Sequence, residues 1–214
     1  MKSNSIIKEK ILNEVGKTIT QRKSPSPPSP SLEPLIFPKL EEGKEVVFAE
    51  KFTQNGGDFI YCASQEDFIE TFYLVAKQNQ WKQVICHEER VKEILSATQI
   101  PFSEKEEIAP ENSTYITTCE AMVARHGSII LSSAQPLSQK TLARAHTHVI
   151  FALSHQIHQE LQQALDAITQ KYREETPSGI TIITGKSKNT TPAVNDIPGT
   201  TGAKSVLLFF IEMG

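Results

Sequence analysis

One polar segment of the sequence has residue types that suit the binding of an anion. Gly185, Lys186, Ser187 and Lys188 follow the β-branched run 179–184, which predicts a short strand. Loop N–H groups and lysine ammonium groups can together hold a carboxylate or a phosphate. We therefore expect an anion-binding loop at the C-terminal end of this strand, and a solvated polar loop is the alternative.

The next glycine-rich segment, 199–205, matches a nucleotide-phosphate loop only in part. Such a loop needs adjacent glycine, lysine and serine residues that open a helix, so that lysine and hydroxyl reach phosphate and magnesium together. Here Ala203 separates Gly202 from Lys204, and the apolar run 206–211 that follows predicts a strand. We expect a tight turn into an edge strand, with Gly202 and Lys204 as further candidates for the anion-binding loop.

Two histidine pairs have spacings that a transition-metal site could use. His146 and His148 would share one face of a strand, and His155 and His158 would share one face of a helix. Imidazole is a common metal ligand. No acidic residue lies among these histidines, so we expect no metal site.

A nucleophilic pair of Cys119 and His126 is a further hypothesis. The pKa of the Cys119 thiol would fall if this residue began a helix, and His126 could act as an acid, a base or an anion contact. One sequence does not place the two side chains together. We assign no catalytic residue.

Composition excludes several classes of protein. A net charge of −3 in 214 residues gives no general attraction to nucleic acid or to anionic lipid. The longest apolar run, 206–211, is too short to span a bilayer, and residues 1–5 lead into a charged helix rather than an apolar signal segment. We expect a cytoplasmic protein that binds neither nucleic acid nor a membrane.

The three cysteines argue against a cofactor held by this chain. Cys62, Cys86 and Cys119 are widely separated, and no C-x-x-C pair occurs. A cysteine-ligated iron–sulfur cluster or structural zinc is therefore not expected. Cys62 and Cys86 lie in predicted strands and should be buried as small apolar residues.

The chain divides into three predicted segments. Apolar residues at helical spacing predict an amphipathic helix within 1–20, which would dock on the domain, on a partner or on a sister subunit. A Pro/Ser-rich linker follows at 21–44, and its composition cannot join a core. Residues 45–214 form the predicted domain, with one sizeable core.

Strand and helix signals alternate through this domain. Strands are predicted at 58–62, 83–86, 115–117, 128–131, 148–153, 179–184 and 206–211. Ser64 with Asp67 predicts the start of a helix, another helix carries Val91, and a third spans 156–172. Residues 45–48 predict a short strand or the start of a helix. The pattern indicates an α/β fold with an open, mostly parallel twisted sheet flanked by helices, mixed at its last connection.

Four segments between residues 48 and 212 resemble the lactate-utilization (LUD) domain family. Residues 56–62 (GGDFIYC) match an early Gly-Gly-x-Phe strand entry, and residues 117–133 (TTCEAMVARHGSIILSS) match a segment usually written T-G-A-[DE]-x-A-I-A-[ED]-T-G-T-I-V-L-S-S. Residues 145–151 (AHTHVIF) match P-P-x-H-I-V-V, and residues 185–205 take the place of the terminal G-P-S-[RK]-T-A-D-I-E … G-x-H-G-A-K-S. The chain is identified as a divergent member, similar to the lactate-utilization protein C type.

The resemblance implies the fold of the sugar-phosphate isomerase and CoA-transferase group. It also implies an accessory role in oxidising L-lactate or a related hydroxy acid, beside iron–sulfur partner proteins that carry their own clusters. A non-catalytic scaffold, or a small-molecule enzyme of the isomerase or CoA-transferase type, is the alternative. A small anionic ligand and a homo-oligomer are compatible with each of these hypotheses.

Departures from the family pattern lie at the family's polar positions. Arg125 replaces an acidic residue and His126 a threonine, while Thr191, Ala193 and Thr201 stand where the family has Asp, Glu and His. A register shift that uses Asp196 would restore one carboxylate. The remaining pocket candidates, taken from the resemblance and from the motifs above, are Glu120, Arg125, His126 and His148.

Overall fold

A computed structural model describes residues 40, 42–81, 83–105, 113–185 and 202–213 of the chain. The predicted N-terminal helix, most of the predicted linker, and the loop residues Lys186, Ser187 and Lys188 lie outside the described residues, as do Thr191, Ala193, Asp196 and Thr201.

The main sheet has six parallel strands in the order β1-β10-β7-β4-β2-β3. Its strands are β1 (Asp58–Cys62), β2 (Gln83–Ile85), β3 (Phe102–Ser103), β4 (Ser113–Thr118), β7 (Thr147–Leu153) and β10 (Ser205–Ile211). The sheet confirms the predicted α/β class with a largely parallel sheet. β10 was expected at an edge, but it lies between β1 and β7, because its uniformly apolar residues suit a strand covered on both faces.

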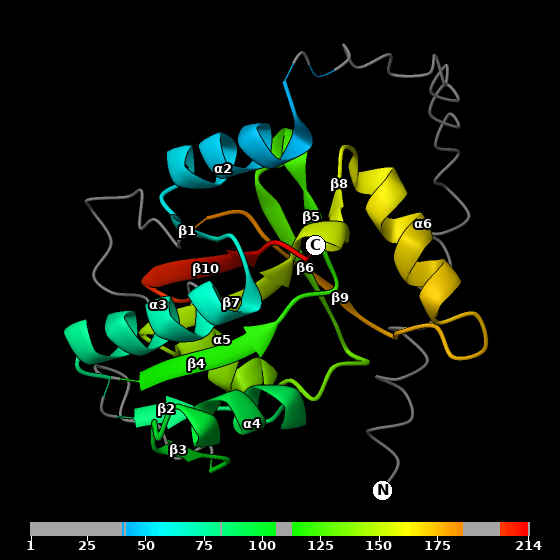
Figure 1. Ribbon diagram of the computed structural model, residues 1–214. Coiled ribbons are helices and arrows are strands. Elements are labelled where there is room, and N and C mark those ends of the chain that lie inside the picture. Colours follow the sequence, from blue (N-terminus) through cyan, green and yellow to red (C-terminus); the bar gives the residue numbers. More distant parts are fainter. Residues whose placement is uncertain (1–39, 41, 82, 106–112, 186–201, 214) are drawn as a thin grey trace, which may run out of the picture. The chain divides into compact units, whose positions relative to one another are not determined.

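Helices cover both faces of this sheet (Figure 1). On one face lie α3 (Gln65–Gln78) and α4 (Glu89–Ala97), and the other face packs against α2 (Lys44–Gln54) and α5 (Gln139–Arg144). Strand β10 shows the division clearly, since Leu207 and Phe209 pack with α3 and α4, whereas Leu208 and Phe210 pack with α2 and α5. Two separate cores therefore form on the two faces of one sheet.

A local signal explains where α3 begins. The Ser64 hydroxyl accepts a 3.2 Å hydrogen bond from the Asp67 backbone N–H, as the N-cap pattern predicted. The sequence allowed either a short strand or the start of a helix at residues 45–48; they belong to α2, and Phe48 is buried.

Among the described residues, no helix combines the length and the apolar character that a bilayer crossing needs.

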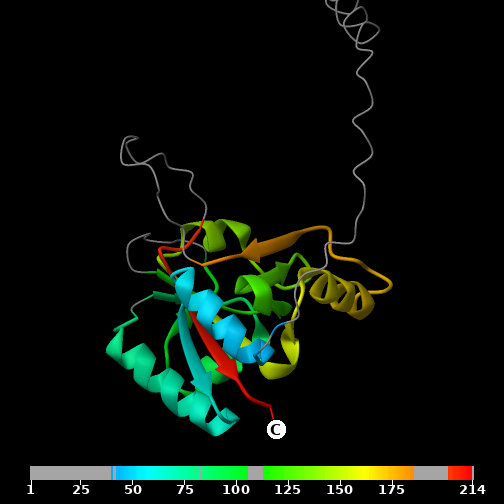
Figure 2. The ribbon, with the colours of Figure 1, turned by 90° about the horizontal axis from the view of Figure 1, so that it is seen from above.

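A second, smaller sheet carries the antiparallel pairs. It has the order β8-β5-β6-β9, formed by β5 (Ala121–Val123), β6 (Ser128–Ser132), β8 (Ile157–His158) and β9 (Ile180–Ile183). The helix α6 (Leu161–Lys171) packs its buried residues Ala164 and Ile168 on this sheet. Figure 2 shows β9 and α6 on the side away from α3. The prediction of one sheet that is mixed at its last connection is therefore wrong, because β9 and β10 lie in different sheets and the antiparallel pairs belong to the second sheet.

The predicted helix 156–172 begins later than expected. Residues Ser154–Gln156 form a single 3₁₀ turn, and Ile157 then pairs with Met122 as part of β8. Ile157 has the spacing of the α6 apolar face, but burial in the second sheet takes precedence over that local pattern. His155 and His158 therefore do not share a helix face.

Candidate functional site

A pocket of about 540 Å³ opens beyond the C-terminal ends of β4, β7 and β10. We call it the carboxyl-end pocket; its lining comprises 88–91, Ile94, 118–120, 134–136, Phe151, Leu153, Gln156, Lys171, Tyr172 and Ile211. Ligands of open α/β sheets bind in the crevice beyond the carboxyl ends of the strands. The volume is typical of a small-molecule site.

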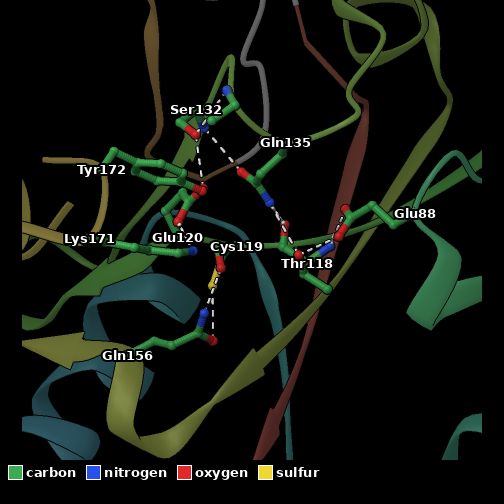
Figure 3. A network of polar contacts seen from close by, with 10 residues as sticks. Glu88, Thr118, Cys119, Glu120, Ser132, Gln135, Gln156, Lys171 and Tyr172 are labelled. Carbon is green, nitrogen blue, oxygen red and sulfur yellow. Dashed lines mark hydrogen bonds and ion pairs between the residues drawn. The ribbon is translucent and has the colours of Figure 1, made fainter. Parts of the chain in front are cut away.

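One wall of this pocket is built around the Glu120 carboxylate, whose side chain is 1% exposed (Figure 3). Lys171 Nζ donates to Oε2 at 2.7 Å, and the Tyr172 hydroxyl donates to Oε1 at 2.6 Å. The Ser132 hydroxyl also donates to Oε1, at 2.8 Å. The buried charge of Glu120 thus joins three segments: the loop after β4, the end of β6 and the end of α6.

A second buried carboxylate, Glu88, fixes the end of β4. Its Oε1 accepts a 2.7 Å hydrogen bond from the Thr118 N–H, and its Oε2 accepts the Thr118 hydroxyl. The Gln135 amide donates to the Thr118 hydroxyl oxygen at 3.1 Å and accepts from the Ser132 N–H at 3.0 Å. Glu88 and Glu120 therefore belong to one continuous polar network (Figure 3).

Cys119 lies between these two carboxylates but does not begin a helix. Its thiol is 3.7 Å from Gln156 Oε1, and Gln156 Nε2 donates to the Cys119 carbonyl at 2.6 Å. Burial raises the pKa of the thiol, and the negative charge of Glu120 adds to this effect. The hypothesis of a thiol activated by a helix start is therefore wrong, since its surroundings disfavour the thiolate.

The ionisation of Glu120 makes a testable prediction about acid stability. Burial alone would raise the pKa of Glu120, but hydrogen bonds from Lys171, Tyr172 and Ser132 outweigh it, and the pKa is lowered. A carboxylate with a lowered folded-state pKa stabilises the fold fully above its unfolded value, about 4.3, and loses this contribution as pH falls through the folded value. The stability advantage of the wild type over Glu120→Gln should therefore be largest near neutral pH and shrink below about pH 4.3.

Urea titrations between pH 3 and 7, followed by circular dichroism, measure this difference. Glu93→Gln, at an exposed position of α4, is the matched control and should give a small and nearly constant difference. An advantage over Glu120→Gln that grows on acidification would contradict the assignment.

A second pocket, of about 300 Å³, lies between α5, β9 and the start of β10. We call it the β9 pocket; its lining comprises Gln139, Leu142, Ala143, His148, 181–185, Gly202, Ala203 and Val206. It brings together Gly185 and Gly202, the two described glycines of the predicted anion-binding loop, with His148. Lys204 is exposed beside it, at the start of β10.

His148 is 1% exposed and makes a 2.8 Å hydrogen bond through Nε2 to the Thr117 hydroxyl. Burial lowers the pKa of His148 to about 3, so the imidazole is neutral. His146 precedes β7 and contacts the Thr147 hydroxyl at 3.3 Å. Among the described residues no three His, Cys, Asp or Glu side chains are placed to hold a metal.

The other pocket candidates lie apart from both pockets. Arg125 Nε donates to both carboxylate oxygens of Glu160 at 2.8 Å, which ties the 3₁₀ turn Ala124–His126 to the start of α6. The side chain of His126 is exposed, and its carbonyl accepts a 2.9 Å hydrogen bond from Asn55 Nδ2. The candidates therefore divide among three places rather than forming one site.

Sequence reasoning missed most of the carboxyl-end pocket. Lys171 is 51 positions from its partner Glu120, and no motif joins them. Glu88 follows a predicted strand and Gln156 begins a predicted helix, but neither residue belongs to a motif that indicated a site. Only the position of Glu88, two residues after a predicted strand, was a usable signal, because side chains there face the carboxyl edge of a sheet.

Comparisons with solved structures show the fold. A DUF162 family protein from Deinococcus radiodurans aligns with a TM-score of 0.59 at 12% identity, over 79% of this chain and 99% of that chain. A D-ribose-5-phosphate isomerase in complex with phospho-erythronic acid aligns with a TM-score of 0.32 at 13% identity, over 61% of this chain and 65% of that chain. The second similarity is too weak to carry an argument.

Comparison with curated proteins finds no match. The LUD domain family matches residues 46–210, which is well over half of the chain. This match confirms the resemblance seen in the four sequence segments, and it supports a role related to lactate utilization. The chain belongs to the LUD domain family.

Proposed function

We propose that this protein is an accessory component of the oxidation of L-lactate or a related hydroxy acid, acting with iron–sulfur partner proteins. The observation that carries this proposal is the family match over residues 46–210. The contribution of the chain itself is the binding of a small organic anion, and the redox chemistry belongs to the partners.

The polar groups of the described residues favour binding over catalysis. Glu120 is ionised and engaged by three donors, so it is poorly placed to accept a proton from a substrate. Cys119 is held as a thiol by burial, and His148 is neutral and hydrogen bonded. An isomerase or CoA-transferase activity needs a base or a nucleophile, and none of these three described groups is suited to that role.

Deletion of the gene should abolish growth on lactate as the sole carbon source and leave growth on glucose unchanged. The reason is that an accessory component is required only for the pathway it serves. Growth curves on both carbon sources measure the effect, and expression of the chain in trans should restore growth on lactate. Normal growth and normal lactate oxidation in the deletion strain would overturn the proposal.

Affinity purification from lactate-grown cells tests the second half of the proposal. We expect the tagged chain to recover iron–sulfur proteins, identified by mass spectrometry and by their visible absorption. Suppose that the chain is recovered alone from a strain that needs it for growth on lactate. This result would refute the proposed iron–sulfur partners, but it would leave the assignment to lactate oxidation intact.

A further inference from the structure

We propose that the carboxyl-end pocket binds a monocarboxylate with an apolar body, whose carboxylate contacts Lys171 and Arg90. The choice of 2-hydroxy and 2-oxo acids as the ligand class rests on the proposed function; the location of the site does not. This placement differs from the predicted anion-binding loop, whose described glycines, Gly185 and Gly202, line the β9 pocket.

The carboxylates that line the pocket are engaged by the protein. Glu89, which is exposed, pairs with Lys92 at 2.7 Å. Both oxygens of Glu88 and both oxygens of Glu120 already accept hydrogen bonds from the protein. Lys171 Nζ carries three N–H donors and gives one of them to Glu120. Its side chain is 58% exposed, so the other two donors can reach a ligand at the mouth of the pocket.

Arg90 supplies a second cation in the lining of the pocket. It lies in the first turn of α4, lines the pocket, and makes no ion pair with any residue that the structure describes. A guanidinium binds a carboxylate through two parallel N–H donors. Lys171 and Arg90 come from the end of α6 and the start of α4, so a carboxylate held by both would link these two helices.

The floor of the pocket is apolar. It is formed by Val91 and Ile94 of α4 and by the strand ends Phe151, Leu153 and Ile211. These residues belong to the core on the α3 and α4 face, or pack against it. A bare inorganic anion would gain nothing from this floor, whereas an aliphatic side chain would be removed from water there.

The β9 pocket is the competing location for the same anion. Its described lining has no charged side chain, and His148 is neutral and already hydrogen bonded to Thr117. A carboxylate there would lose hydration without a cationic partner among those residues. Among the described residues the carboxyl-end pocket is therefore the better anion site; Lys186 and Lys188 lie outside them.

Isothermal titration calorimetry with the full chain tests the ligand class. The probes are lactate, 2-hydroxybutyrate, 2-hydroxyhexanoate, pyruvate and inorganic phosphate. Affinity should rise about fourfold for each methylene added to the 2-hydroxy acid, because each buried CH₂ is removed from water. Inorganic phosphate should bind more weakly than any of the acids. Phosphate binding as tight as 2-hydroxybutyrate, or no binding by any acid, would overturn the proposal.

Two substitutions test the location. Lys171→Met and Arg90→Gln should each weaken binding of 2-hydroxyhexanoate about tenfold or more, since each removes a charged hydrogen bond. Lys77→Met is the control and should leave affinity unchanged, because Lys77 is an exposed lysine on α3 that does not line this pocket. Unchanged affinity in both Lys171→Met and Arg90→Gln would contradict the placement.

Two further measurements distinguish loss of binding from misfolding of a variant, and failure of this site from failure of the proposed function. Thermal unfolding of each variant shows whether it is folded; if Lys171→Met is not, Arg90→Gln decides, because Arg90 has no role in the Glu120 network. If the purified chain binds the acids but its deletion leaves growth on lactate normal, this site is supported and the proposed function is refuted. Lactate growth that depends on the chain, together with no acid binding, would refute this site alone.

Discussion

Replacing Phe209 with alanine is expected to lower the free energy of unfolding by about 3–5 kcal/mol. Phe209 is 0% exposed and lies in β10, at the centre of the core on the α3 and α4 face. Its ring makes edge-on contacts with Phe68, Phe72 and Phe151 at centroid distances of 5.7, 5.7 and 5.8 Å. The truncation removes these contacts and leaves a cavity between sheet and helix.

Urea denaturation followed by circular dichroism measures this loss. Leu74→Ala is the control: Leu74 lies on α3, close in sequence to Phe72, but is 57% exposed, and its loss should change stability by no more than about 0.5 kcal/mol. Equal effects of the two substitutions would contradict the assignment of this face as a packed core.

Gly127→Ala is expected to destabilise the fold by about 2–5 kcal/mol. Gly127 has φ +60°, the left-handed region, and ends the 3₁₀ turn Ala124–His126. A Cβ there would lie 2.3 Å from the backbone nitrogen of Phe52 and 2.5 Å from the backbone carbon of Lys51. Backbone atoms of α2 cannot move aside as a side-chain tip could, so the helix must separate from the turn.

Gly179→Ala is the matched control for this prediction. Gly179 has no positive φ, and the nearest atom to an added Cβ is Ser133 Cβ at 3.9 Å. This substitution should be neutral or stabilise by up to about 1 kcal/mol, through the unfolded chain. Melting temperatures from differential scanning calorimetry distinguish the two cases. A Gly127→Ala protein as stable as Gly179→Ala would mean that α2 does not pack this closely.

The sheet class could be predicted from the sequence because a strand that is buried on both faces is apolar at successive positions. The runs 148–153 and 206–211 are apolar without alternation, which indicates covered strands. The same runs do not say which strands are neighbours, so the central place of β10 could not be predicted. The start of α6 was predicted too early, because Ile157 fits the helical spacing and its pairing with Met122 leaves no local signal.

The candidate site was predictable only in part, for a related reason. Gly185, Gly202 and His148 were singled out from motifs, and they do line one pocket. Glu120 was singled out too, but it lines the other pocket, and its partner Lys171 comes from a helix end 51 positions away. Contacts between distant segments carry the polar network, and a single sequence does not record them.

The central position of β10 has a consequence for synthesis on the ribosome. β1 lies at the edge of the main sheet, and its neighbour there is β10, whose residues 205–211 are made long after residues 58–62. At about 5–20 residues per second, β1 and α3 would wait roughly 7–30 seconds for this strand. During that interval Phe68 and Phe72 lack the ring of Phe209 that covers them in the finished fold. The nascent chain is therefore the state in which this aromatic face most needs a chaperone.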